Sequence, residues 1–197
     1  GGAICCVRLG QGPAITLLHG IPLSLATWRH TLAPLARRAT VVAYDLRGFG
    51  RSEKPAGDYS VPAQARVLEQ VLDAFGLPAT SLVGSSYGCA PALHFARTRP
   101  DRVDRLVLIN SVGYPARRHS AERLLRIGLV AALMRSALRH APLGRALFAA
   151  RLRRSYASPG ADLAAEAEAY YALLRRGGGE QSFLATLRQF REAELAQ

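Results

Sequence analysis

A chain of 197 residues, 49% hydrophobic and 20% charged, is long enough to bury one core and too apolar to be disordered. Its formal charge of +12 would suit an acidic partner, but the basic residues other than Lys54 are arginines scattered along the chain. Because no recognition motif accompanies this charge, nucleic acid is not an expected partner.

The cysteines and the N-terminus indicate a reduced protein without a secretion signal. Cys5, Cys6 and Cys89 lack the paired spacing of a disulfide framework or a zinc site, so no metal is expected. The first residues contain no signal peptide, and the apolar run 127–134 is too short to span a bilayer. We expect a cytoplasmic protein without stable membrane insertion; the missing initiator Met leaves room for an upstream segment.

Short apolar, β-branched runs alternate with helical patterns up to about residue 111, which is typical of an α/β fold with a parallel sheet. The later strands are nearly continuous apolar runs, as expected for a sheet covered on both faces. Ser60 and Gly76 can cap the second helix, and Pro100 follows the third. The pattern predicts strands at 3–8, 14–18, 40–44, 81–83 and 105–109, and helices at 26–38, 61–75 and 87–98.

From Gly113 the chain is rich in Arg, Ala and Leu with helical periodicity, interrupted at Pro142, 158–160 and 177–179. We expect a helical subdomain without a further strand.

Gly84-Ser85-Ser86-Tyr87-Gly88 is a G-x-S-x-G motif between an apolar strand and a helix. Such a turn exposes its central serine, and the helix start directs backbone N–H groups toward an oxyanion. The motif predicts Ser86 as a nucleophile and Tyr87 N–H as one oxyanion donor. A glycine-rich turn without chemistry is the alternative interpretation.

His19-Gly20-Ile21-Pro22 follows the second predicted strand. Its position favours the backbone N–H of Ile21 as the second oxyanion donor, although an ordinary turn at a strand end has the same pattern.

The chain resembles the α/β-hydrolase superfamily, in its capped branch, in four blocks that occur in the expected order. The resemblance covers nearly all of 1–112, and it implies that this segment is the N-terminal part of an α/β-hydrolase core and that 113–197 is a helical cap region. The blocks are LLHGIPLSLATW from Leu17, YDLRGFGRS from Tyr44, LVGSSYGCAPALHFA from Leu82 and RPDRVDRLVLINS from Arg99.

By this resemblance Ser86 is the nucleophile, and Ile21 and Tyr87 supply the oxyanion hole. Relatives that act on epoxides or haloalkanes carry Asp at the nucleophile position, so Ser86 argues against both activities. Asp45 matches an aspartate that braces the following loop, rather than the acid of a catalytic triad.

The family order of a triad is Ser, then Asp or Glu, then His, and no strand pattern follows Ile109. We expect the acid and the base beyond Gln197, with the C-terminal strands absent from a fragment that is nearly inert alone. A naturally short protein without a normal triad is the alternative. The histidines are each expected to be structural or exposed: His19, His30, His94, His119 and His140.

The favoured function is acyl transfer on an ester or related carbonyl substrate, without a cofactor. The expected partner is a small molecule with an apolar acyl or ester group; the oligomeric state is not predicted. Alternatives are a carbon–carbon bond hydrolase, a cofactor-free haloperoxidase-like enzyme, or a non-catalytic ligand-binding member of the family. Aromatic side chains in the cap, which could equally be core, are candidates for the pocket wall: Tyr170, Tyr171, Phe183 and Phe190.

Overall fold

The computed structural model describes residues 2–112, 128–155 and 163–190. A five-stranded sheet has the order β1-β3-β2-β4-β5, with β1 antiparallel to β3 and all other pairs parallel. The expected α/β-hydrolase architecture with a mainly parallel sheet is therefore confirmed. The strands are β1 (Cys6–Leu9), β2 (Ala14–Leu18), β3 (Thr40–Tyr44), β4 (Thr80–Ser85) and β5 (Val103–Ile109).

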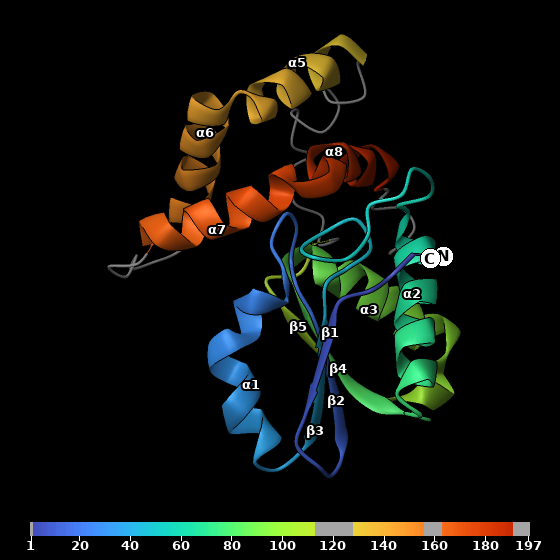
Figure 1. Cartoon of the computed structure of the whole chain (residues 1–197). Helices are drawn as coiled ribbons and strands as arrows, with labels where there is room; N and C mark the ends of the chain where they lie inside the picture. The colour runs from blue at the N-terminus through green and yellow to red at the C-terminus, as the bar shows by residue number, and fades with distance from the viewer. Residues whose placement is uncertain (1, 113–127, 156–162, 191–197) are drawn as a thin grey trace.

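Helices cover both faces of this sheet (Figure 1). Helix α1 (Arg29–Ala36) lies on one face, and α2 (Val61–Ala74) and α3 (Cys89–Thr98) lie on the other. Ser60 caps α2 by accepting a hydrogen bond from Ala63 N at 3.4 Å. The predicted helix 26–38 is instead a 3₁₀ turn, Leu25–Trp28, which the Ser24 side chain caps, followed by α1. The two are separated at Trp28, whose φ of −92° and ψ of 3° are not those of an α-helix.

Neighbouring residues of the central strands enter different cores, because side chains alternate between the two faces of a strand. Leu17, Val41 and Ala43 pack in the cluster beneath α1, with Trp28. Leu18, Val42 and Tyr44 belong to the larger cluster beneath α2 and α3. The two faces together explain why these strands are apolar at every position except Thr16 and Thr40, which are also buried.

β5 departs from the expectation that the later strands are covered on both faces. Val107, Leu108 and Ile109 are 48%, 39% and 45% exposed. Within the described residues, β5 pairs with β4 alone and forms the edge of the sheet. An apolar run shows that a strand suits burial, but the element beside it decides whether the strand is buried.

The described parts of the region after Gly113 are helical, as expected. The helices lie together at the end of the sheet where the parallel strands finish (Figure 1). They have their own core, which includes Phe148, Tyr171 and Leu174. These helices, for which we use the name cap helices, are α5 (Gly128–Arg139), α6 (Ala141–Arg153), α7 (Leu163–Arg175) and α8 (Gly179–Gln189).

Polar contacts attach α7 and α8 to residues 2–112, which carry the sheet and are called the sheet domain below. Arg29 Nη1 lies 3.0 Å from Glu166 Oε1, and Tyr59 N donates to Gln189 Oε1 at 2.6 Å. The predicted boundary between 112 and 113 borders residues outside the described ranges, so it stays a prediction.

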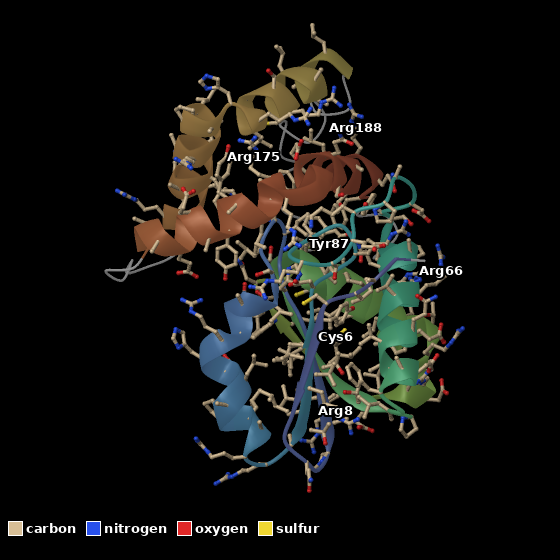
Figure 2. The ribbon with its side chains drawn as sticks, viewed as in Figure 1. Cys6, Arg8, Arg66, Tyr87, Arg175 and Arg188 are labelled. Carbon is tan, nitrogen blue, oxygen red and sulfur yellow. The ribbon has the colours of Figure 1, made fainter. Side chains whose placement is uncertain are left out.

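The arginines labelled in Figure 2 come from different parts of the fold: Arg8 from β1, Arg66 from α2, Arg175 from α7 and Arg188 from α8. The cationic residues are therefore spread over both the sheet domain and the cap helices. None of the helices in the described ranges is long and apolar enough to cross a membrane.

Candidate active site

Ser86 stands at the turn between β4 and α3, as the motif predicts. Its φ of 51° lies in the left-handed region, which residues with a Cβ rarely adopt. The predicted helix 87–98 begins with a 3₁₀ turn, Ser86–Gly88, and becomes α-helical only at Cys89. This tight first turn carries the chain from strand to helix.

Glycines allow the backbones around Ser86 to approach closely. A Cβ on Gly84 would lie 2.7 Å from the Cα of Cys89, which is shorter than real contacts of this kind. A Cβ on Gly20 would lie 3.0 Å from the Cβ of Ser86. The turn after β2 and the turn after β4 are therefore in direct contact.

Ile21 and Tyr87 flank Ser86 from these two turns. Ile21 lines the same cavity as Ser86, and its N–H has no hydrogen-bond acceptor within the described part of the chain. Tyr87 follows Ser86 directly, and its buried ring contacts Phe190 at a centroid distance of 5.7 Å. That the two amides converge on one oxyanion stays a prediction.

His19 is fully buried and holds the turn that contains Ile21. Leu46 N donates to its Nε2 at 3.0 Å, so Nδ1 carries the proton and donates to the carbonyl of Gly20 at 2.9 Å. Burial lowers the pKa of His19, and this outweighs the opposite effect of Asp45, whose Oδ1 lies 3.9 Å from Nε2. The imidazole is neutral, so its contact with Asp45 is not an ion pair.

Asp45 has the bracing geometry expected of it. Its carboxylate accepts hydrogen bonds from Leu25 N at 2.6 Å and from Arg51 N at 2.7 Å. These bonds join the loop after β3 to the turn that precedes α1.

The other histidines lie away from Ser86 or outside the described residues. His30 and His140 are exposed, His94 lies in α3, and His119 is not among the described residues. Within the described ranges, the Ser86 hydroxyl makes no hydrogen bond to a histidine, and no group of three potential metal-ligating side chains occurs.

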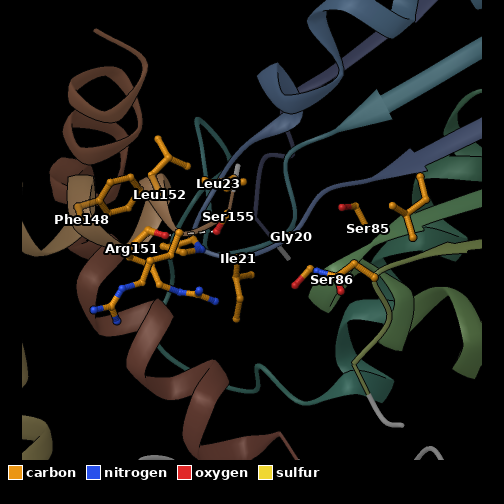
Figure 3. A pocket seen from close by; sticks show the side chains of 13 residues that line it. Gly20, Ile21, Leu23, Ser85, Ser86, Phe148, Arg151, Leu152 and Ser155 are labelled. Atoms are coloured by element: carbon orange, nitrogen blue, oxygen red, sulfur yellow. Dashed lines mark hydrogen bonds between the residues drawn. The ribbon is translucent and has the colours of Figure 1, made fainter. Parts of the chain in front are cut away.

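A cavity of about 440 Å³ opens above Ser86, a volume within the range of small-molecule sites. Figure 3 shows Gly20 and Ser86 on one side and the α6 residues Phe148, Arg151 and Leu152 on the other. The full lining is Gly20, Ile21, Pro22, Leu23, Ser85, Ser86, Ile109, Asn110, Phe148, Arg151, Leu152, Arg154 and Ser155.

The aromatic residues predicted for the pocket wall do not line this cavity. Tyr170 and Tyr171 face the core of the cap helices, where the Tyr171 hydroxyl donates to Leu138 O at 2.7 Å. Phe183 packs between that core and the core of the sheet domain, and Phe190 contacts Tyr87. Phe148 contributes the aromatic wall instead. Periodicity predicts α6 but not which of its faces meets the cavity.

Several curated proteins are similar to about half of this chain. An uncharacterized protein of Mycobacterium tuberculosis is 44% identical over 104 residues, covering 53% of this chain and 30% of its own length. A soluble epoxide hydrolase of Corynebacterium is 34% identical over 106 residues, covering 54% and 37%. A 2-hydroxy-6-oxo-2,4-heptadienoate hydrolase of Pseudomonas putida is 39% identical over 109 residues, covering 53% and 40%. The matched parts thus amount to less than half of each relative.

Among solved structures, an alpha/beta hydrolase fold protein from Burkholderia ambifaria superposes with a TM-score of 0.86 and 27% identity. The match covers 99% of this chain and 70% of that protein. Residues 13–159 also match the profile of the family described as alpha/beta hydrolase fold. With the strand order and the turn at Ser86, these matches identify the chain as a member of the alpha/beta hydrolase fold family.

Proposed function

We propose that Ser86 is the nucleophile of a serine hydrolase that acts by acyl transfer on an ester or related carbonyl substrate. The observation that carries the proposal is the position of Ser86, a non-glycine residue with φ of 51° at a strand-to-helix turn that faces a cavity.

In this reaction the Ser86 oxygen attacks the carbonyl carbon and its proton passes to a base. The tetrahedral oxyanion rests on the backbone N–H groups of Ile21 and Tyr87, and then the bond to the alcohol oxygen breaks. The alcohol leaves with the proton, and water releases the acid from Ser86. No histidine of the described residues hydrogen-bonds to the Ser86 hydroxyl, and the expected place of the base beyond Gln197 stays a prediction.

Cleavage of a carbon–carbon bond is the second candidate, because the P. putida relative with 39% identity is named as a hydrolase of a 2-hydroxy-6-oxo dienoate. The Corynebacterium relative is named as an epoxide hydrolase. Family members that open epoxides carry an Asp at the nucleophile position, by the resemblance described above. This chain has Ser86 there, which argues against epoxide opening.

Labelling by a fluorophosphonate tests the role of Ser86. We expect slow modification of the 197-residue chain at Ser86, with loss of labelling in Ser86→Ala. Ser85→Ala is the matched control, because Ser85 lines the same cavity and should not be needed. Labelling that persists in Ser86→Ala, or that depends equally on Ser85, would contradict the proposal.

A further inference from the structure

The two sides of the Ser86 cavity differ in chemistry. The sheet domain contributes Ser86 and apolar side chains that include Ile21 and Ile109. On the other side, α6 contributes Phe148 and Arg151 (Figure 3), and Arg154 directly follows the last residue of α6. No Asp or Glu is among the residues that line the cavity. A molecule between the two sides would therefore meet positive charge opposite the serine.

Two other arginines of the cap helices form ion pairs within the protein. Arg139 lies 2.9 Å from Glu180, and Arg145 lies 3.1 Å from Glu168. Within the described residues, neither Arg151 nor Arg154 has a carboxylate within 4.0 Å. No carboxylate of the described residues therefore competes with an external anion for these two guanidinium groups.

The position of these arginines at the end of α6 has a simpler explanation in the partial charge of the helix terminus. Basic residues in the last turn of a helix interact favourably with its C-terminal carbonyls, and α6 ends at Arg153. That effect accounts for basic residues at this end of the helix. It does not distinguish Arg151 and Arg154, which line the cavity, from Arg153, which does not.

We propose that the Ser86 cavity accepts substrates that carry a carboxylate, and that Arg151 and Arg154 bind this group. A guanidinium offers planar paired donors that match the two oxygens of a carboxylate. The apolar wall would hold the carbon chain between the carboxylate and the reacting carbonyl. The inference rests on the proposed function, since it takes the cavity at Ser86 as the substrate site.

Hexanoate and its uncharged counterpart hexanamide test the charge preference without any reaction. Their dissociation constants can be measured by NMR titration of the 197-residue chain. We expect hexanoate to bind roughly tenfold more tightly than hexanamide, because only the acid forms charge-assisted hydrogen bonds with arginine. Equal binding of the two probes, or no binding of hexanoate, would overturn the proposal.

Variants at the C-terminal end of α6 locate the source of the preference. In Arg151→Gln/Arg154→Gln the advantage of hexanoate should disappear, whereas Arg153→Gln removes one charge outside the cavity wall and should retain it. Thermal unfolding of each variant verifies that the fold is kept. Loss of the preference in Arg153→Gln, or its retention in the double variant, would assign it to the overall charge or to another anion site.

The two proposals fail in different ways. If Ser86 is labelled but hexanoate binds no more tightly than hexanamide, the proposed serine hydrolase is supported and the carboxylate preference is wrong. If hexanoate binds more tightly and this depends on Arg151 and Arg154, but Ser86 is never labelled, the cavity binds acids and the proposed acyl transfer is wrong.

Discussion

The Nδ1–H of His19 donates to the carbonyl of Gly20 across 2.9 Å, and so a buried side chain fixes the turn that faces Ser86. Because Nε2 accepts from Leu46 at the same time, protonation of the ring would break this arrangement. Protonation of His19 would therefore change the geometry of the turn that faces Ser86.

The folded protein should lose stability as the pH falls below about 6.5, the ordinary histidine pKa. Burial lowers the pKa of His19 in the folded state, so the unfolded chain takes up a proton that the native chain does not. One such site gives a slope of up to about 1.4 kcal/mol per pH unit until the folded pKa is reached. Urea unfolding at about pH 7.5, 6.5 and 5.5 measures this slope.

His19→Gln should be less stable at pH 7.5 but should show a smaller slope over the same range. His30→Gln is the control, since His30 is exposed and its loss should leave the slope as it is. An unchanged slope in His19→Gln would show that another group carries the pH dependence.

Gly20→Ala should slow the labelling of Ser86 by roughly tenfold, because small displacements of reacting groups have large effects on rate. The added Cβ would lie 3.0 Å from the Cβ of Ser86 and 3.3 Å from Ser85 O, so the two turns must separate slightly. Gly76→Ala is the matched control. At Gly76 a Cβ is disfavoured by the φ of +64° and not by a contact, since nothing lies within 4 Å of it. Gly76→Ala should therefore lower stability without slowing the labelling. Equal rates in wild type and Gly20→Ala would argue against this contact.

Asp45→Ala should lower the free energy of unfolding by about 2–4 kcal/mol, because it leaves the N–H groups of Leu25 and Arg51 without their acceptor. Asp45→Asn keeps one acceptor oxygen and should lose less. Asp104→Ala, at an exposed position of β5, should change stability little. If Asp45→Asn stays folded at wild-type stability yet abolishes the labelling of Ser86, the carboxylate would have a part in the chemistry.

Replacement of His119 and His140 by Ala should leave the labelling rate of Ser86 unchanged. His140 is exposed at the residue before α6, and His119 is assigned to the cap by sequence alone. Turnover of p-nitrophenyl esters gives a second measurement, and we expect no sustained turnover from the 197-residue chain. Many turnovers that disappear in His119→Ala or His140→Ala would show that a cap histidine serves as the base.

The sequence predicted those features that local chemistry determines. The strands at 14–18 and 40–44, the cap at Ser60 and the turn at Ser86 each depend on a few adjacent residues, and all are present in the structure. The exposure of Val107 depends on which strand lies beside β5, and the placement of Phe148 depends on how α6 meets the sheet domain. Such tertiary relations have no local pattern, so Arg151 and Arg154 could not be assigned to the site from the sequence.

The backbone of Ser86 also affects how the protein tolerates substitution. With φ at 51°, any side chain at this position costs on the order of 1 kcal/mol, which glycine largely avoids. Ser86→Gly should therefore unfold at a higher urea concentration than Ser86→Ala, although both lack the hydroxyl. If Ser86 is the nucleophile that we propose, serine at this position trades stability for function, because the fold would accept glycine more readily but glycine lacks the hydroxyl.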